Sequence, residues 1–563
     1  MKVVIIGGVA AGASAAARLR RLDEAAEIIL LEKGSHVSYA NCGLPYHLGG
    51  VIPQRKSLLV VTPERFKRQF NVQVRVESEV LSIDRTAKNV TVRTREGETY
   101  TESYDKLVLA TGSSPIPLQI PGVENPRVTH LWTLADMDQA LLHVNAGAKR
   151  VVLVGAGFVG LEAAENLREK GLEVTVVQRS NHVLSTVDRE MAVPLAKELE
   201  SCGIRFEFER VVKEFIANEF HIGVVLDNGK QIECDFAILC AGVKPNSELA
   251  RSAGLELGTH GHIVTDEYLT TSDPDIFAAG DAVEVRDPIL GVRTAIPLAG
   301  PANKQGRLVA DNIMGARNRY WGSMGASILK AGKLTVGMVG LTEARLKQKS
   351  VAYEKIYLAP NSNASYYPGG TILNIKLIFA PDGKILGAQV VGVKGVDKRI
   401  DVIATAMRNG MTAPELGYLE LSYAPPYNSA KDPVNMAGMV AENVLNGTSK
   451  VVHADSIPEG SFLLDVREVV EFNLGTIPGS VNIPLGTLRE RLTELPKERE
   501  IVVFCQAGTR GYVAERILRQ HGFNVKNLSG GYLIWKLFNP ASLSAPVLSC
   551  CTPAGCTETT KNS

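Results

Sequence analysis

The sequence predicts an α/β protein with two βαβ units, a mixed α+β region and a small separate α/β domain near its C-terminal end. A β-branched strand, a glycine turn and a helix occur together twice, at residues 2–22 and 150–167. Mixed strand and helix patterns run from about residue 325 to 450. After a polar connector with Gly and Pro at 446–461, a new series of strand, loop and helix begins, which is typical of a separate domain.

The first βαβ unit opens the chain as "KVVIIGGVAAGASAAARLRRL". Gly7, Gly8 and Gly12 form the turn, and the helix that follows offers unpaired N–H groups to a pyrophosphate. Glu32 ends the next strand, where a dinucleotide-binding unit places a carboxylate for ribose hydroxyls. Val9 stands at the second glycine position of G-x-G-x-x-G, so this motif alone is only moderately specific.

The second unit, "RVVLVGAGFVGLEAAENL", carries the full pattern with Gly155, Gly157 and Gly160. Two such motifs in one chain favour an enzyme that binds two dinucleotides. The strand that follows ends in Gln178 and Arg179, where an NAD enzyme usually carries Glu or Asp. Gln can bond a ribose hydroxyl and Arg can meet a 2′-phosphate, so we expect both NADH and NADPH to serve.

Two further segments contain motifs that add to the two glycine motifs. "LATGSSP" contains Thr111 and Gly112, and "TSDPDIFAAGDAVE" contains Asp281. With the two glycine motifs, they resemble the two-dinucleotide-binding flavoprotein disulfide reductases. The resemblance implies Rossmann-like domains, with FAD in the first site and NADH or NADPH in the second. Its expected FAD residues are Gly7, Gly8, Gly12, Glu32, Lys33, Asn41, Thr111, Gly112, Asp281, Pro297 and Ala299, and its expected nicotinamide-site residues are Gly155, Gly157, Gly160, Gln178 and Arg179.

Cys42 in "YANCGLPY" is the candidate nucleophile. Typical members of this superfamily use C-x-x-x-x-C, but His47 stands where the second cysteine would be. The segment is similar to the single-cysteine branch of coenzyme A-disulfide reductases, NADH peroxidases and NADH oxidases, in which one thiolate receives electrons from the flavin and meets the substrate. Pro45 fits the first turn of a helix, so we expect a helix N-terminus to lower the Cys42 pKa. A buried structural cysteine is the alternative.

Residues 325–447, including "LSYAPPYNSAKDPVNMAG", resemble the dimerisation domain of coenzyme A-disulfide reductases. This implies a homodimer in which tyrosines reach the partner's active site, and Tyr367 and Tyr427 are the candidates for protonating a leaving thiolate. Tyr366 and Tyr423 are near enough in sequence to exchange with them, and all four can instead be ordinary interface aromatics. The residues expected to hold coenzyme A are Arg18, Arg21, Ser38, Asn41 and Lys304, although surface charges are often only solvated.

The C-terminal domain contains "DVRE", "IPGSVNIP" and "CQAGTR", which match the rhodanese domain. The loop leaves a strand and opens a helix, so its N–H groups can stabilise Cys505 as a thiolate or persulfide. Arg510 would complete the anion cradle. The spacing C-x4-R is that of sulfurtransferases, whereas cysteine phosphatases use C-x5-R. Since only Arg510 is charged in the loop, a persulfide or polysulfide donor fits better than doubly charged thiosulfate.

Together these features predict a reductase of coenzyme A persulfide, polysulfide and coenzyme A disulfide. Cys505 would deliver sulfane sulfur, and Cys42 would attack the S–S bond, release hydrosulfide and form a mixed disulfide with coenzyme A that is reduced through FAD. Three alternatives stay open: a coenzyme A-disulfide reductase for thiol maintenance, an NADH oxidase or peroxidase, and a sensor with a persulfide-binding module.

The expected domains are FAD-binding at 1–115 and 245–324, NAD(P)H-binding at 116–244, dimerisation at 325–447, a linker at 448–457, rhodanese at 458–545 and a disordered tail at 546–563. Tail residues Cys550, Cys551 and Cys556 could relay sulfur, whereas a metal site is not expected because no histidine accompanies them.

The chain has 61 Lys and Arg against 60 Asp and Glu, so no nucleic-acid partner is expected. No apolar stretch reaches the roughly 20 residues that span a bilayer, so no membrane association is expected. The apolar start breaks at Gly7 and is not expected to be a secretory signal. Eight cysteines are too sparse for a disulfide framework, which favours a cytoplasmic location.

Overall fold

The structure, a computed structural model, describes residues 1–542. These form two compact units, which are treated separately. The first contains Met1–Arg179 and Arg210–Gly325, and the second contains Ser180–Glu209 and the chain from Ala326 onward. Tail residues Cys550, Cys551 and Cys556 lie outside the described residues.

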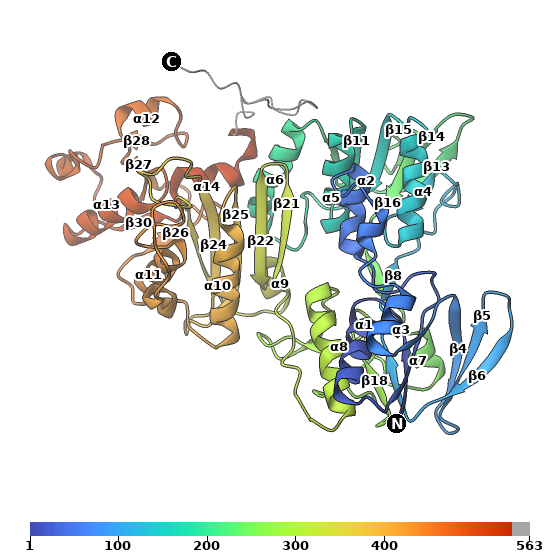
Figure 1. The fold of residues 1–563 in the computed structure, drawn as a ribbon. Helices are drawn as coiled ribbons and strands as arrows, with labels where there is room; N and C mark the ends of the chain where they lie inside the picture. The colour runs from blue at the N-terminus through green and yellow to red at the C-terminus, as the bar shows by residue number, and fades with distance from the viewer. Residues whose placement is uncertain (543–563) are drawn as a thin grey trace, which may run out of the picture. The chain divides into compact units, whose positions relative to one another are not determined.

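The first unit begins with a parallel five-stranded sheet. Its central strand β1 is β-branched and buried from Val3 to Ile6 and pairs with β2 and β7. Helices α1 and α8 lie side by side on this sheet (Figure 1). They can approach closely because Gly306 has no side chain: a Cβ there would lie 2.1 Å from the carbonyl oxygen of Ala11. In sheet order the strands are β18 (Ile276–Ala278), β7 (Lys106–Leu109), β1 (Lys2–Ile6), β2 (Glu27–Leu31) and β3 (Gln73–Arg75), and the helices are α1 (Ala10–Leu22) and α8 (Ala299–Ile313).

A second parallel sheet in this unit carries the second glycine turn. Strand β10 pairs in parallel with β11 and β16, and β16 pairs with β9. Its elements are β11 (Glu173–Gln178), β10 (Arg150–Val154), β16 (Phe236–Leu239), β9 (Val128–His130), α4 (Leu134–Asn145) and α5 (Phe158–Glu169). Each parallel sheet thus holds one strand–turn–helix motif.

Smaller elements fill the rest of the first unit. The antiparallel sheets are β4 (Ser78–Asp84), β5 (Asn89–Thr94) and β6 (Thr99–Ser103), then β13 (Val212–Ala217), β14 (Ile222–Leu226) and β15 (Gln231–Cys234). The two-stranded pairs are β8 (Ser113–Pro115) with β17 (Val243–Pro245), and β19 (Val285–Arg286) with β20 (Arg293–Thr294). The short helices are α2 (Leu44–Gly49), α3 (Pro63–Phe70) and α7 (Glu248–Ser252).

The second unit contains an antiparallel five-stranded sheet in which β25 is buried along its whole length. Helix α10 packs on β22 and β25. The sheet consists of β21 (Ser327–Ala331), β22 (Leu334–Gly340), β25 (Ile385–Gly392), β24 (Leu373–Phe379) and β23 (Glu354–Leu358). The accompanying elements are α6 (Arg189–Ser201), β12 (Arg205–Phe208), α9 (Glu343–Gln348), α10 (Val396–Arg408) and α11 (Pro433–Leu445).

The second unit ends in a parallel sheet with the order β26-β30-β29-β27-β28. Its elements are β26 (Val451–Val452), β27 (Phe462–Asp465), α12 (Val469–Asn473), β28 (Val481–Asn482), β29 (Ile501–Phe504), α13 (Thr509–Gln520), β30 (Val525–Leu528) and α14 (Gly531–Phe538). Residues 448–457 contribute β26, so we propose that this domain starts near residue 450 rather than 458. The predicted α/β fold class is confirmed.

Candidate functional site

The first glycine turn has the shape that a bound phosphate requires. Gly7 adopts φ +100°, and a Cβ there would lie 2.1 Å from the carbonyl oxygen of Ala110. A Cβ at Gly12 would lie 1.8 Å from the carbonyl oxygen of Gly7. Helix α1 begins directly after this turn, and Val9 at its N-cap provides no side-chain hydrogen bond to the free N–H groups. The turn therefore leaves helix donors available to a ligand phosphate.

Glu32 directly follows β2 and lies beside this turn. Its carboxylate accepts hydrogen bonds from the backbone N–H of Gly8 at 2.8 Å and of Gly34 at 2.7 Å. The carboxylate is therefore fixed next to the start of α1, as a ribose-binding group requires. Lys33 beside it is exposed.

Asp281, Thr111 and Gly112 converge in the same unit. The Ser113 hydroxyl donates to Asp281 at 2.8 Å, and burial raises the pKa of Asp281 despite that hydrogen bond. Thr111 donates through its hydroxyl to the carbonyl oxygen of Asn246. Pro297 and Ala299 lie at the start of α8, whose N-cap also makes no side-chain hydrogen bond. These positions fit an elongated dinucleotide whose polar groups meet backbone donors.

The second glycine turn repeats this geometry. Gly155 adopts φ +109°, and a Cβ there would lie 2.4 Å from the carbonyl oxygen of Cys240, whereas a Cβ at Gly157 would meet no protein atom within 4 Å. A Cβ at Gly160 would lie 2.0 Å from the Gly155 carbonyl oxygen. The space over Gly157 thus lies open at the start of α5. The Gln178 amide oxygen accepts from the Ala156 N–H at 3.0 Å, and Arg179 is exposed.

Cys42 lies in a single 3-10 turn, Asn41–Gly43, directly before α2, and its side chain is exposed. Pro45 occupies the first turn of α2, as the sequence predicts. Exposure disfavours the interpretation of Cys42 as a buried structural cysteine. The other free cysteines of residues 1–542 are Cys202, Cys234, Cys240 and Cys505.

The expected direction of the Cys42 pKa is wrong. Partial desolvation of the sulfur by the surrounding protein raises the Cys42 pKa although the side chain is exposed, and the carboxylates of Glu162 and then Asp281 raise it further, while a backbone hydrogen bond at Cys42 lowers it. Helix α2, which begins directly after this turn, has only 6 residues. The protein chain alone therefore favours the thiol at Cys42.

Glu162 is a titratable residue that sequence reasoning missed. It lies on α5 and accepts a hydrogen bond from the Tyr46 hydroxyl of α2 at 3.1 Å. Burial raises the pKa of Glu162 to about 7, and the neighbouring Glu165 adds to this, while Tyr46 opposes it. In the sequence, the only indication of a role for Glu162 was its position two residues after Gly160. Glu162 thus changes charge near neutral pH beside Cys42.

The residues expected to hold coenzyme A are not equally available. Arg18 forms an ion pair with Asp311 of α8 at 2.6 Å, so its charge is already matched within the chain. Arg21 and Lys304 are exposed. Ser38 has φ 46°, its N–H donates to the Gly8 carbonyl, and its own carbonyl accepts from Val60. Arg21 and Lys304 are therefore the free cations of this group.

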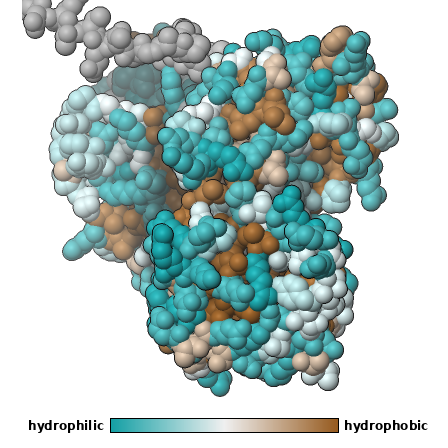
Figure 2. Space-filling model, turned by 45° about the vertical axis from the view of Figure 1, so that its right-hand side comes forward, coloured by the Kyte–Doolittle hydropathy of each residue, from teal (hydrophilic) through white to brown (hydrophobic). Residues whose placement is uncertain are grey.

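The candidate tyrosines lie on the second unit and face solvent in the single chain. Tyr366 and Tyr427 are each 74% exposed, and Tyr367 is 41% exposed. The hydroxyls of Tyr366 and Tyr423 are hydrogen-bonded at 2.6 Å, which brings those two segments together. On the face of the protein shown in Figure 2, hydrophobic residues form patches between hydrophilic ones. Such exposed tyrosines are typical of interfaces.

Cys505 follows β29 in a loop that ends at α13. Its thiol is buried, and the N–H of Gly508 points to Sγ at 3.2 Å. Gly508 adopts φ +100°, which directs this N–H back into the loop. The hydrogen bond with Glu471 raises the pKa of Arg510, and Cys505 contributes less. The loop thus holds the thiol beside one donor N–H and one guanidinium.

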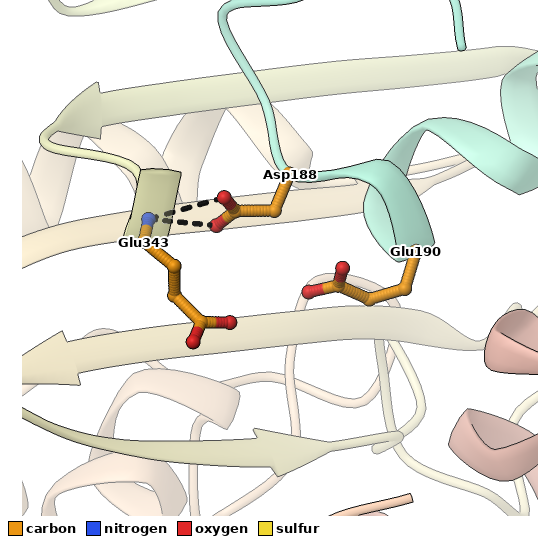
Figure 3. Close-up of side chains that lie close together, drawn as sticks. All are labelled: Asp188, Glu190 and Glu343. Atoms are coloured by element: carbon orange, nitrogen blue, oxygen red, sulfur yellow. Dashed lines mark hydrogen bonds between the residues drawn. The ribbon is translucent and has the colours of Figure 1, made fainter. Parts of the chain in front are cut away.

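A third cluster in the second unit contains three buried carboxylates, from Asp188, Glu190 and Glu343 (Figure 3). Their oxygens lie within 4.8 Å of one another, a spacing that could hold a metal ion. However, the ammonium of Lys376 binds all three at 2.7, 2.6 and 2.5 Å and is 0% exposed. Burial alone would raise the pKa of Glu343, but Lys376 holds it at about 2. The cluster is an internal ion network with a lysine at its centre.

A sequence profile of pyridine nucleotide-disulphide oxidoreductases matches residues 1–306. The chain belongs to this family. Its dimerisation domain matches residues 328–433, and a rhodanese-like domain matches residues 450–537. The predicted family, FAD and NAD(P)H as cofactors, and a flavoprotein oxidoreductase activity are thereby confirmed. The glycine turns that begin at Gly7 and Gly155 fit these two dinucleotides.

Curated relatives and solved structures extend the comparison. An NADH oxidase from Methanocaldococcus jannaschii is 34% identical over 80% of this chain and 100% of its own, and a coenzyme A disulfide reductase from Staphylococcus epidermidis is 33% identical over 78% and 100%. Reduced CoADR-RHD from Bacillus anthracis is 46% identical with a TM-score of 0.94, covering 96% and 98% of the two chains. A NAD-dependent persulfide reductase from A. fulgidus is 38% identical with a TM-score of 0.90, covering 95% and 100%.

No helix within residues 1–542 is both long enough and apolar enough to cross a membrane.

Proposed function

We propose that this family member is an NAD(P)H-dependent reductase of coenzyme A persulfide and polysulfide that also reduces coenzyme A disulfide. The observation that carries the proposal is the presence of two differently built cysteine sites in one chain. Cys42 is an exposed thiol without a second redox cysteine in its motif, and Cys505 lies in a loop of the sulfurtransferase spacing. The similarity to a persulfide reductase and to CoADR-RHD along nearly the whole chain supports this combination.

In the proposed reaction, the Cys42 thiolate attacks the coenzyme A sulfur of CoA–S–SH. The S–S bond of the persulfide breaks, hydrosulfide leaves with the electron pair, and a Cys42–S–S–CoA disulfide forms. The two electrons that reduce this disulfide to the Cys42 thiolate and coenzyme A thiol would come from NAD(P)H through bound FAD. The sum is CoA–S–SH + NAD(P)H + H⁺ giving CoA–SH + H₂S + NAD(P)⁺. Coenzyme A disulfide follows the same steps with a second coenzyme A as leaving group.

The chain's own residues divide the remaining work. Gly7, Gly12 and Glu32 would hold the FAD phosphates and ribose, and Gly155 and Gly157 would hold the nicotinamide dinucleotide. Asp281 would contact the polar portion of FAD.

The match to a dimerisation domain supports a homodimer. In such a dimer Tyr367 and Tyr427 would protonate the leaving thiolate in the partner's site. Arg21, Lys304, Ser38 and Asn41 would contact coenzyme A, while Arg18 is occupied by Asp311.

Two variants test the division between the cysteines. Cys42→Ser should abolish NADH oxidation with every S–S substrate, because no other thiol in the motif can replace it. Cys505→Ser should spare coenzyme A disulfide and impair polysulfide. The measurement is anaerobic NADH oxidation at 340 nm on the purified flavoprotein, with Cys202→Ser as the control thiol substitution. Turnover retained by Cys42→Ser, or equal loss on both substrates in Cys505→Ser, would contradict the proposal.

An NADH oxidase is the second candidate, since the M. jannaschii relative carries that name. It would share Cys42 and both nucleotide sites but would leave the rhodanese-like domain without a role. Oxygen consumption separates the two, because an oxidase consumes O₂ with NADH alone, whereas the proposed reductase oxidises NADH only with an S–S substrate.

A further inference from the structure

The Cys505 loop contains a charge arrangement that its sequence does not reveal. Arg510 is the only charged residue from 505 to 510, which alone would make the loop cationic. In the structure its guanidinium forms two parallel hydrogen bonds with Glu471 of α12, Nη1 to Oε2 at 2.6 Å and Nη2 to Oε1 at 2.7 Å. Such a two-bond pair fixes both groups and cancels the charge of Arg510.

Glu471 is held in this position from its own side as well. It lies in the first turn of α12, and its Oε2 accepts the backbone N–H of Glu468 at 3.1 Å in a capping box. The hydrogen bond from Arg510 lowers the pKa of Glu471, so the carboxylate is charged at neutral pH. Both side chains are about one-third exposed, so an incoming donor can reach them.

Of the two other cations near the loop, Arg467 and Lys536, the first is also paired with a carboxylate. Arg467 is buried, and its guanidinium binds the buried carboxylate of Asp465 at 2.6 Å. Lys536 lies 5.2 Å from the ring centre of Tyr532, whose N–H donates to the Cys505 carbonyl. Burial and then Arg467 lower the pKa of Lys536. Two of the three cations are thus neutralised by carboxylates.

We propose that Glu471 is a specificity-determining residue of the Cys505 site. By neutralising Arg510 it disfavours donors whose transferable sulfur is attached to an anionic sulfonate, such as thiosulfate, and favours alkyl persulfides, which carry at most one charge at that end. The inference rests on the proposed role of Cys505 as acceptor of sulfane sulfur and adds the class of donor.

The chemistry balances for either donor. The Cys505 thiolate attacks the outer sulfur of R–S–S⁻, the S–S bond breaks, and R–S⁻ leaves with the electron pair and takes a proton. Cys505–S–S⁻ results. With thiosulfate the same attack expels sulfite. Cyanide then takes the outer sulfur as thiocyanate and restores the Cys505 thiolate, so each cycle can be measured as thiocyanate.

The test measures kcat/KM of the full-length flavoprotein for thiosulfate and for coenzyme A persulfide, with cyanide as acceptor. Glu471→Gln has the same shape and can still accept from Arg510, but it leaves the Arg510 charge uncompensated. We expect the thiosulfate-to-persulfide ratio to rise at least tenfold, equivalent to about 1.4 kcal/mol. Glu471→Asp keeps the charge and should raise the ratio less than Glu471→Gln.

Glu490→Gln removes an exposed carboxylate from the same domain and should leave the ratio unchanged. An unchanged ratio in Glu471→Gln, or an equal loss of both activities, would overturn the inference, since the latter would mean that Glu471 only positions Arg510. Cys505→Ser distinguishes a failure of the Glu471 inference from a failure of the proposed role of Cys505. If thiocyanate formation persists in Cys505→Ser, the proposed role of Cys505 itself fails, whatever the effect of Glu471.

Discussion

The substitution Glu162→Gln tests the electrostatics around Cys42, and its effect can be worked out in magnitude and sign. Burial raises the pKa of Glu162 from 4.5 to about 7. The difference between 4.5 and about 7 corresponds to roughly 3 kcal/mol between the two protonation states of Glu162. Because the pKa of Glu162 is higher in the folded protein than in the unfolded chain, its protonated form favours folding. This contribution to the free energy of unfolding is complete below pH 4.5 and is lost as the pH rises through 7.

Glutamine cannot ionise, so Glu162→Gln should stabilise the protein above pH 7 and have little effect at pH 5. At roughly 2–4 °C per kcal/mol for a domain of this size, the Tm at pH 8 should rise by up to about 6–12 °C. Scanning calorimetry of the flavin-saturated protein at pH 5 and 8 measures this. Glu169→Gln, an exposed substitution at the end of the same helix, is the control. An equal effect of Glu162→Gln at both pH values would refute the reasoning.

The same variant should change the reactivity of Cys42. Glu162 raises the Cys42 pKa only when it is ionised, so the difference between variant and wild type should emerge as the pH passes 7. Alkylation of Cys42 by iodoacetamide, followed by peptide mass spectrometry, reports the thiolate fraction. We expect Cys42 to react faster in Glu162→Gln than in wild type at pH 8, and equally at pH 5. Equal rates at pH 8 would show that Glu162 does not affect the thiol.

The remaining predictions concern other parts of the chain. Lys376→Leu leaves three buried carboxylates without their central cation and should lower the free energy of unfolding by about 3–5 kcal/mol, measured as a lower urea midpoint for the second unit. The control Lys349→Leu, at an exposed lysine, should cost little. A loss below about 1 kcal/mol in Lys376→Leu would contradict the ion-network assignment. Because Glu343 has a pKa of about 2, its stabilisation is present above pH 4.5 and should disappear as the pH falls towards 2. NADH and NADPH should support steady-state rates within about a hundredfold of each other, about 2.7 kcal/mol, and Arg179→Ala should lower kcat/KM for NADPH more than for NADH; an equal effect on both would show that Arg179 is only solvated. Tyr427→Phe should lower kcat for coenzyme A disulfide at least tenfold if its hydroxyl protonates the leaving thiolate, and an unchanged kcat would make it an ordinary interface aromatic.

The features that sequence reasoning predicted are local ones. Gly7 and Gly155 have positive φ because the turn between strand and helix requires it, and that turn spans only a few residues. The position of Cys42 before a helix with Pro45 in its first turn, and the strand–loop–helix around Cys505, are set by similarly short segments. Such patterns are visible in sequence because the residues that determine them are neighbours.

The features that sequence reasoning missed depend on residues far apart in the chain. Glu162 reaches Tyr46 across 116 residues, and Glu471 reaches Arg510 across 39. The sequence indicated a helix N-terminus at Cys42 but neither the desolvation of its sulfur nor the nearby carboxylates, so the direction of the Cys42 pKa was predicted wrongly. Charge compensation is a tertiary property, and no local pattern encodes it.

The central claim is that this oxidoreductase acts on persulfide sulfur. The most direct measurement is anaerobic NADH oxidation, comparing kcat/KM for coenzyme A persulfide and polysulfide with that for coenzyme A disulfide. We expect a persulfide or polysulfide to be preferred by more than about tenfold, which is about 1.4 kcal/mol of transition-state stabilisation. A preference for coenzyme A disulfide would contradict it and would identify a thiol-maintenance reductase.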